Sequence, residues 1–181
     1  MIGYKVQQNY MPENVMIPHF GLDKRMVGVE IGVAAGSGSI TMLMDIRHLT
    51  LYSIDSWKHQ DPAEGIERLE VALPQAELDL AYETAKIRLK DYGPRSIIIR
   101  KESDDAINDV PAVIDYLFID GDHNYGQVVK DLRNYAPKVQ YKGIVAGHDY
   151  LYKEGVRRAV TEYFNGKVVH LGDDDVWWVY V

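Results

Sequence analysis

The chain has 181 residues, of which 46% are hydrophobic and 26% charged, and this composition is ordinary for one globular domain with a sizeable core. Its net charge of -7 argues against a nucleic-acid partner, and the absence of cysteine excludes disulfides, thiolate metal sites and cysteine nucleophiles. No apolar run is long enough to cross a bilayer, and the N-terminus carries no basic and apolar signal, so we expect a cytoplasmic protein without a membrane partner.

The first 21 residues are polar and irregular, and they include Pro12 and Pro18. We expect an N-terminal arm or lid over residues 1–21 and a single domain over residues 22–181. Such arms often cross to a neighbouring copy of the chain, so a homo-oligomer is an open alternative.

Short segments rich in isoleucine, valine and leucine recur after the arm, with little polar alternation. This composition is typical of parallel strands that are covered on both faces. The predicted strands are Met26–Ile31, Thr50–Asp55, Ser96–Arg100, Ile114–Asp120 and Val139–Gly147.

Helical patterns fall between these strands. Apolar residues repeat at helical spacing over Tyr125–Tyr135 and Val156–Phe164, and a shorter helix is expected over Asp104–Asn108, with Ser103 as its N-cap. The connection Trp57–Leu80 is expected to be partly helical and to cover a substrate site. The alternation of strands and helices predicts an α/β fold, Rossmann-like, with a doubly wound and mostly parallel sheet.

The pattern changes after Phe164. We predict a short strand over Lys167–Leu171, a turn over Gly172–Asp175 and a second strand over the strongly β-prone Val176–Val181. The seven-stranded sheet should therefore end in a hairpin that places one strand antiparallel to the others.

The most informative segment is the glycine-rich loop Glu30–Ser39, which follows the first strand and opens a helix. Its glycines at positions 32, 36 and 38 do not fit the G-x-G-x-x-G spacing of a dinucleotide-binding loop. Glu30 would repel a pyrophosphate but could attract a cationic amino-acid group. Asp55 ends the second strand, where an acid can bind both hydroxyls of a ribose. These residues favour a ligand with a ribose and a cationic amino group.

Glu30–Gly38 resembles motif I of the class I S-adenosylmethionine-dependent methyltransferases, Ser53–Trp57 resembles their acidic motif after the second strand, and Lys101–Asp105 resembles the segment that holds the adenine. The predicted hairpin is also typical of that fold. The resemblance implies S-adenosylmethionine as cofactor, with glycines 32 and 36 at the methionine, Asp55 at the ribose, and Ser103 or Asp104 at the adenine. The full set of cofactor-binding residues that it implies is Glu30, Gly32, Ala34, Gly36, Ser37, Asp55, Ser56, Ser103, Asp104 and Asp120.

A second polar cluster follows two neighbouring strands, at Asp120–Tyr125 and Gly147–Tyr150. In open α/β sheets, ligands bind outside the carboxyl ends of the strands, so this cluster should face the glycine loop. Its sequence resembles the sugar and macrolide O-methyltransferases of the macrocin type. That resemblance implies a hydroxyl of a small molecule, such as a sugar or a natural product, as the methyl acceptor.

Two ways of activating a hydroxyl are open at this cluster. A histidine can take the proton, or a divalent cation held by carboxylates can lower the pKa of the hydroxyl. Asp120 and Asp149 suit Mg²⁺ as hard oxygen ligands. The resemblance extends to catechol-type enzymes and implies that Asp120 takes part in the chemistry and that His123 is the base. His148 is either a third catalytic residue or an orienting partner of Asp149.

We therefore predict an S-adenosylmethionine-dependent methyltransferase that acts on a small-molecule hydroxyl, with Mg²⁺ as an optional second cofactor. Two alternatives stay open. One is an NAD(P)-dependent oxidoreductase, which the glycine spacing and Glu30 disfavour. The other is a non-catalytic nucleotide-binding subunit that keeps the fold without the reaction.

Overall fold

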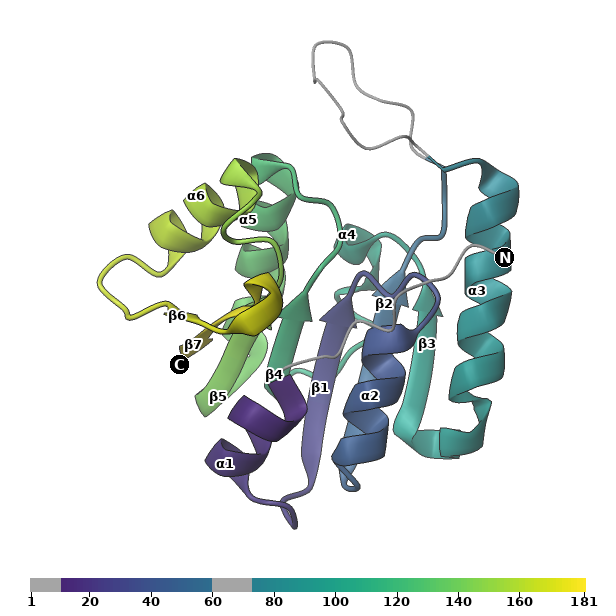
Figure 1. Cartoon of the computed structure of the whole chain (residues 1–181), viewed down its shortest axis with the longest axis horizontal. Helices are drawn as coiled ribbons and strands as arrows, with labels where there is room; N and C mark the ends of the chain where they lie inside the picture. Colours follow the sequence, from purple (N-terminus) through teal and green to yellow (C-terminus); the bar gives the residue numbers. More distant parts are fainter. Residues whose placement is uncertain (1–10, 60–72) are drawn as a thin grey trace.

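A seven-stranded sheet lies at the centre of the protein, in the strand order β3-β2-β1-β4-β5-β7-β6 (Figure 1). The computed structural model describes residues 11–59 and 73–181. Its strands are β1 (Met26–Ile31), β2 (Leu49–Asp55), β3 (Ser96–Arg100), β4 (Ile114–Ile119), β5 (Val139–Gly147), β6 (His170–Leu171) and β7 (Trp177–Tyr180). Strands β1 to β5 are parallel, and β7 is antiparallel to both β5 and β6. The predicted mostly parallel sheet with an antiparallel terminal hairpin is confirmed.

Helices cover both faces of this sheet, which explains why its parallel strands are so apolar. The longer helices and the short α4 are α2 (Ser37–Asp45), α3 (Gln75–Leu89), α4 (Ser103–Ala106), α5 (Tyr125–Tyr135) and α6 (Glu154–Tyr163). Residues of α4, α5 and α6 belong to one hydrophobic core, whereas residues of α2 and the end of α3 belong to another. The central strand β4 is buried along its whole length between the two.

Helices α5 and α6 confirm the two amphipathic stripes that the sequence predicts. Val128, Leu132 and Tyr135 of α5 are buried, as are Val156 and Val160 of α6. These faces pack on the sheet and fix the position of the loops that precede each helix.

Part of the predicted N-terminal arm packs as core. A π-helical turn over Pro12–Met16 leads into α1 (Ile17–Phe20), and Met11, Val15 and Met16 are buried in the same core as α2. Residues 1–10 of the predicted arm and residues 60–72 of the predicted Trp57–Leu80 connection lie outside the described residues. Within that connection, α3 begins at Gln75, while the domain boundary at residue 22 stays a prediction.

Two local predictions are wrong. Ser103 is the first residue of α4 and not its N-cap, which is Glu102, because the Ser103 hydroxyl donates to Asp131 instead of capping the helix. The predicted strand Lys167–Leu171 shortens to β6, since only His170 and Leu171 find partners in β7. Both corrections reflect tertiary contacts that override a local pattern.

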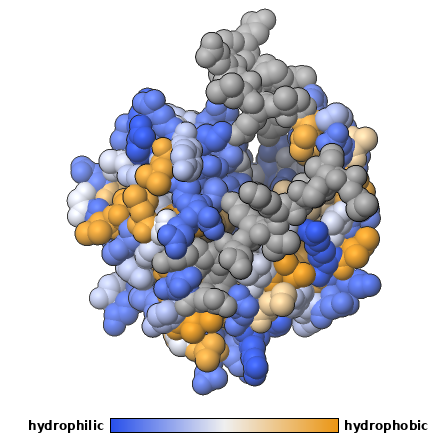
Figure 2. Space-filling model, viewed as in Figure 1, coloured by the Kyte–Doolittle hydropathy of each residue, from blue (hydrophilic) through white to orange (hydrophobic). Residues whose placement is uncertain are grey.

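The surface is mainly hydrophilic on the face drawn in Figure 2, where apolar side chains form separate patches. Among the helices in residues 11–59 and 73–181, none combines the length and the apolar character that crossing a membrane would need.

Candidate functional site

A cavity of about 910 Å³ opens at the carboxyl ends of β1, β2, β3 and β4, in the size range of small-molecule sites. Its walls include six predicted site residues: Gly32, Asp55, Ser56, Ser103, Asp120 and His123. The predicted residues that are not among the residues of the wall are Glu30, Ala34, Gly36, Ser37, Asp104, His148 and Asp149. The strand ends therefore bring the two predicted clusters to one space.

The glycine loop between β1 and α2 is shaped by contacts within the protein. Gly32 has a φ of +90°, and a Cβ on it would overlap the backbone carbonyl of Asp120, because the ends of β1 and β4 touch there. Gly36 has a φ of +78° and is the N-cap of α2, and a Cβ on it would lie 3.3 Å from the Cα of Ala85 in α3. Close packing requires glycine at position 32, and the positive φ favours glycine at position 36, whatever ligand the loop binds.

Asp55, at the end of β2, holds the glycine loop. Its Oδ2 accepts hydrogen bonds from the backbone N–H groups of Val33 and Ala34, each at 2.9 Å. Its Oδ1 accepts a bond of 2.8 Å from the backbone N–H of Trp57. Bonds from backbone N–H groups to a carboxylate are strong, so Asp55 is a fixed point of the cavity wall.

Trp57 holds the same loop from the other side, a role that the sequence did not reveal. Its indole Nε1–H donates to the carbonyl of Ala34 at 2.8 Å, and its ring packs with Val33 and Ala85. Ala34 and Trp57 have φ values of +46° and +44°, a conformation that costs about 1–3 kcal/mol for each residue. The hydrogen bonds around Asp55 and the burial of the indole offset this cost.

Glu30 lies in the interior and faces hydroxyls. Its carboxyl accepts hydrogen bonds from Ser39 of α2 and Ser53 of β2. Burial raises its pKa to about 8, against the opposing effect of Ser39, so most of it is protonated at neutral pH. The expected contact with a cationic group of the ligand stays a prediction. Ser37 is also engaged within the protein, since its Oγ accepts a bond of 3.0 Å from Arg88.

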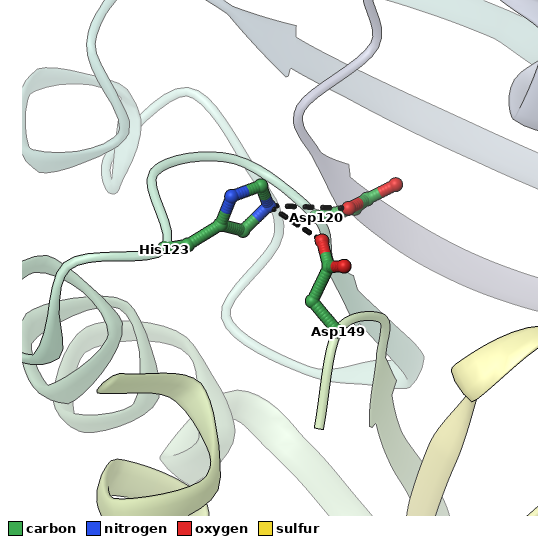
Figure 3. Close-up of side chains that lie close together, drawn as sticks. All are labelled: Asp120, His123 and Asp149. Carbon is green, nitrogen blue, oxygen red and sulfur yellow. Dashed lines mark ion pairs between the residues drawn. The ribbon is translucent and has the colours of Figure 1, made fainter. Parts of the chain in front are cut away.

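Asp120, His123 and Asp149 converge from two loops, the one between β4 and α5 and the one after β5 (Figure 3). The Nε2 atom of His123 lies 2.9 Å from Oδ2 of Asp149 and 3.7 Å from Oδ1 of Asp120. One donor atom from each of the three side chains lies within 4.8 Å of the other two. The imidazole of His123 thus lies between two carboxylates, and the three residues lie together as the sequence predicts.

The charges of this cluster shift each other's pKa values. Asp120 and Asp149 beside the imidazole raise the pKa of His123 to about 10, so the ring is an imidazolium at neutral pH in this state. Burial raises the pKa of Asp120, and the nearby His123 opposes that rise. The bonds from His123 and His148 hold the pKa of Asp149 far below its usual range. Asp149 is therefore the charged anchor of the cluster.

His148 contacts Asp149 and is not among the residues of the cavity wall. Its Nδ1 lies 3.5 Å from Oδ2 of Asp149, and that neighbour raises its pKa. Its backbone N–H donates to the carbonyl of Ile119 at 3.2 Å. This placement favours the alternative in which His148 orients Asp149.

The end of the cavity between α4 and α5 contains two lining residues that sequence reasoning missed, Gln127 and Asp131. Ser103 donates to Oδ1 of Asp131 at 2.6 Å, and burial raises the pKa of Asp131 to about 6. Asp104 lies outside the wall, where its carboxylate meets Lys130 and Asn134. The sequence pattern could have pointed to Asp131, because this acidic residue lies on the apolar face of α5. It stands three residues after the buried Val128 and four before the buried Tyr135.

The start of α6 contributes a further part of the wall, residues 152–155, that was not predicted. Gly155 allows this helix to approach the loop that carries His123, because a Cβ on it would lie 2.5 Å from the carbonyl oxygen of His123.

Comparison with known proteins places these features in a family. Residues 29–150 match a protein-family model described as a methyltransferase domain. This match spans the glycine loop, Asp55, Asp120, His123 and Asp149. No curated protein matches the chain.

Solved structures with the same fold include several methyltransferases. The calicheamicin methyltransferase CalS11 has 16% sequence identity and a TM-score of 0.66, with 88% of this chain and 73% of that chain covered. The O-methyltransferase NovP has 24% identity and a TM-score of 0.63, with coverage of 86% and 71%. An rRNA methylase from Streptococcus thermophilus has 14% identity and a TM-score of 0.59, with coverage of 87% and 86%. At these identities the likeness shows the fold and leaves the acceptor open.

Proposed function

The chain belongs to the methyltransferase domain family and is an S-adenosylmethionine-dependent enzyme, and we propose that it methylates a hydroxyl oxygen of a small molecule. The observation that carries this proposal is the cluster of Asp120, His123 and Asp149, of which Asp120 and His123 line the cavity. A hydroxyl is a weak nucleophile at neutral pH, and a proton acceptor flanked by carboxylates is the machinery that it needs.

The cavity wall fits the cofactor in its chemistry. Asp55 is fixed by three backbone N–H groups, and its Oδ1 receives one of these bonds, so the carboxylate keeps lone pairs that could accept from ribose hydroxyls. Gly32 also lines the cavity, and without a side chain it leaves room for the methionine moiety. These groups would place the sulfonium methyl toward Asp120 and His123.

The donor set also fits a hard divalent cation. Two carboxylates face one another across a short gap, and burial already disfavours the charged form of Asp120. Asp120 and Asp149 would hold such a cation, which when bound supplies positive charge that lowers the pKa of an acceptor hydroxyl. Compensation of the two negative charges would also lower the pKa of His123 from about 10 and prepare it to receive a proton.

The reaction balances with the residues present. The acceptor oxygen forms a bond to the methyl carbon while the carbon–sulfur bond of the sulfonium breaks. The hydroxyl proton passes to Nε2 of His123, which accepts it as the neutral imidazole and becomes the imidazolium. The protein's part is to align oxygen, carbon and sulfur and to hold the proton acceptor beside the oxygen.

A turnover assay tests this proposal with S-adenosylmethionine and a panel of acceptors, with S-adenosylhomocysteine as the measured product. The panel follows the described functions of the structural neighbours: a TDP-linked deoxysugar such as CalS11 uses, a caffeoyl-CoA thioester, and an rRNA fragment. We expect methylation of a hydroxylated small molecule that is lost in His123→Ala. Methylation of the rRNA fragment alone, or turnover that is unchanged in His123→Ala, would contradict the proposal.

A further inference from the structure

Asp131 is a buried carboxylate, and only one of its two oxygens has hydrogen-bond partners among the described residues. It is 1% exposed, and its Oδ1 accepts from the hydroxyl of Ser103 at 2.6 Å and from the amide of Gln127 at 3.1 Å. Its Oδ2 is buried and has no hydrogen-bond partner among the described residues. An unpaired buried polar atom costs about 1–3 kcal/mol, so such atoms are rare unless a partner arrives from outside the protein.

A ligand in the cavity could supply that partner, because Asp131, Gln127 and Ser103 all belong to the cavity wall. The carboxylate is held in one orientation by these neighbours. Ser103 is itself fixed, since its backbone carbonyl accepts a bond of 2.6 Å from the hydroxyl of Tyr135. A fixed carboxylate with one free oxygen selects a hydrogen-bond donor and rejects an acceptor.

S-adenosylmethionine offers three kinds of donor: the α-ammonium, the ribose hydroxyls and the adenine 6-amino group. Asp55 at the end of β2 is placed for the ribose, and the sulfonium must face His123. An ammonium is strongly hydrated and costly to bury, whereas an amino group on a flat ring costs less. The buried Oδ2 of Asp131 therefore matches the adenine best.

We propose that the free oxygen of Asp131 accepts a hydrogen bond from the adenine 6-amino group and makes the protein prefer adenine to hypoxanthine in its cofactor. This inference rests on the use of S-adenosylmethionine. It assigns to α5 a role that the sequence resemblance gives to Ser103 or Asp104. A purely architectural Asp131, which only joins α5 to Ser103, would need Oδ1 alone.

Asparagine at position 131 separates the two roles. In Asp131→Asn, the amide oxygen can still accept from Ser103 and Gln127, while an NH₂ donor replaces the free oxygen. Calorimetry at pH 8, where Asp131 is ionised, measures binding of S-adenosylhomocysteine, S-inosylhomocysteine and 5′-methylthioadenosine. We expect the wild type to prefer the adenine compound over its hypoxanthine analogue by about tenfold or more. Asp131→Asn should abolish or reverse that preference and weaken 5′-methylthioadenosine, which lacks the amino-acid moiety, as much as S-adenosylhomocysteine.

Two further variants serve as comparisons. Asp105→Asn removes a charge from an exposed side chain of α4 and should leave the preference unchanged. Asp104→Asn tests the role at the adenine that the sequence resemblance gives to Asp104. A loss of preference there would transfer the contact to Asp104 and overturn the inference, whereas a retained preference supports Asp131.

Equal binding of the adenine and hypoxanthine compounds to the wild type overturns the inference even if Asp131→Asn does not fold. Weakened S-adenosylhomocysteine with unchanged 5′-methylthioadenosine also overturns it, because the contact then lies on the amino-acid end. A wild type that binds none of the three compounds refutes the use of S-adenosylmethionine itself, and the inference falls with it.

Discussion

Asp55 ends β2 and Asp120 directly follows β4, both at the carboxyl end of the parallel strands. The surroundings of the two carboxylates are nevertheless opposite. Asp55 receives three backbone N–H bonds and holds a loop in place. Asp120 faces an imidazole and a second carboxylate, and burial raises its pKa. The same residue type holds a loop where backbone N–H groups bind it, and we propose that it reacts where it faces a histidine instead.

The difference divides the cavity into a binding half around Asp55 and Trp57 and a reacting half around Asp120, His123 and Asp149. Changes in the first half should act on cofactor affinity and stability. Changes in the second half should act on turnover while affinity stays nearly constant.

The largest effect is expected for His123→Ala. Removal of a general base lowers the rate about 100- to 10,000-fold. Binding of S-adenosylhomocysteine, measured by calorimetry, should change little, because His123 belongs to the reacting half. His48→Ala, which alters an exposed histidine, is the matched control and should retain full turnover. A parallel loss of affinity in His123→Ala would break the division.

Metal removal should produce the next largest effect. Treatment with a chelator is expected to lower turnover by about a hundredfold, since a divalent cation supplies several kcal/mol of charge stabilisation, and added Mg²⁺ should restore it. Asp149→Asn should raise the Mg²⁺ concentration needed for half-maximal turnover. Full activity in the presence of the chelator would assign proton removal to the side chains alone.

Glu30→Gln tests the interior of the binding half through pH. The pKa of Glu30 is raised from 4.5 to about 8, so the native state keeps a proton that the unfolded chain loses as pH rises through 4.5. Wild-type stability therefore falls between about pH 4.5 and pH 8, by a few kcal/mol at about 1.36 kcal/mol for each pKa unit. The variant lacks this loss, so its free energy of unfolding, measured in urea, should gain on the wild type as pH rises. A constant difference across that range would show that Glu30 titrates normally.

Trp57→Phe should give the smallest effect. The aromatic ring stays in its packing site while the hydrogen bond to Ala34 disappears, which costs about 1 kcal/mol. We expect several-fold weaker binding of S-adenosylhomocysteine and a lower melting temperature, with an unchanged pH dependence of turnover. A changed pH profile would mean that the two halves are coupled through the loop.

The elements of this fold that could be predicted are those with strong periodicity. The strands from Met26 to Gly147 could be predicted within about one residue because each is a short segment rich in isoleucine, valine or leucine. The position of the site could be predicted from the rule that ligands bind at the carboxyl ends of parallel strands. This rule correctly predicted that Asp55 and Asp120 line the same cavity.

The parts that could not be predicted depend on packing between distant segments. Asp131 looks like an ordinary helical acid until α4 is placed beside it, and only then does Ser103 become its partner. Met16 belongs to a segment that seems too polar for a core, yet it is fully buried. The role of Trp57 requires a carbonyl that lies 23 residues earlier in the chain.

Gly32 carries a consequence for anyone who would re-engineer this enzyme. Since no side chain fits between this position and the backbone carbonyl of Asp120, the glycine loop and the loop that carries Asp120 must move together. Redesign of the loop for an altered cofactor must retain this glycine. A larger residue at this position would displace Asp120. A substitution meant to change cofactor specificity would then also change turnover.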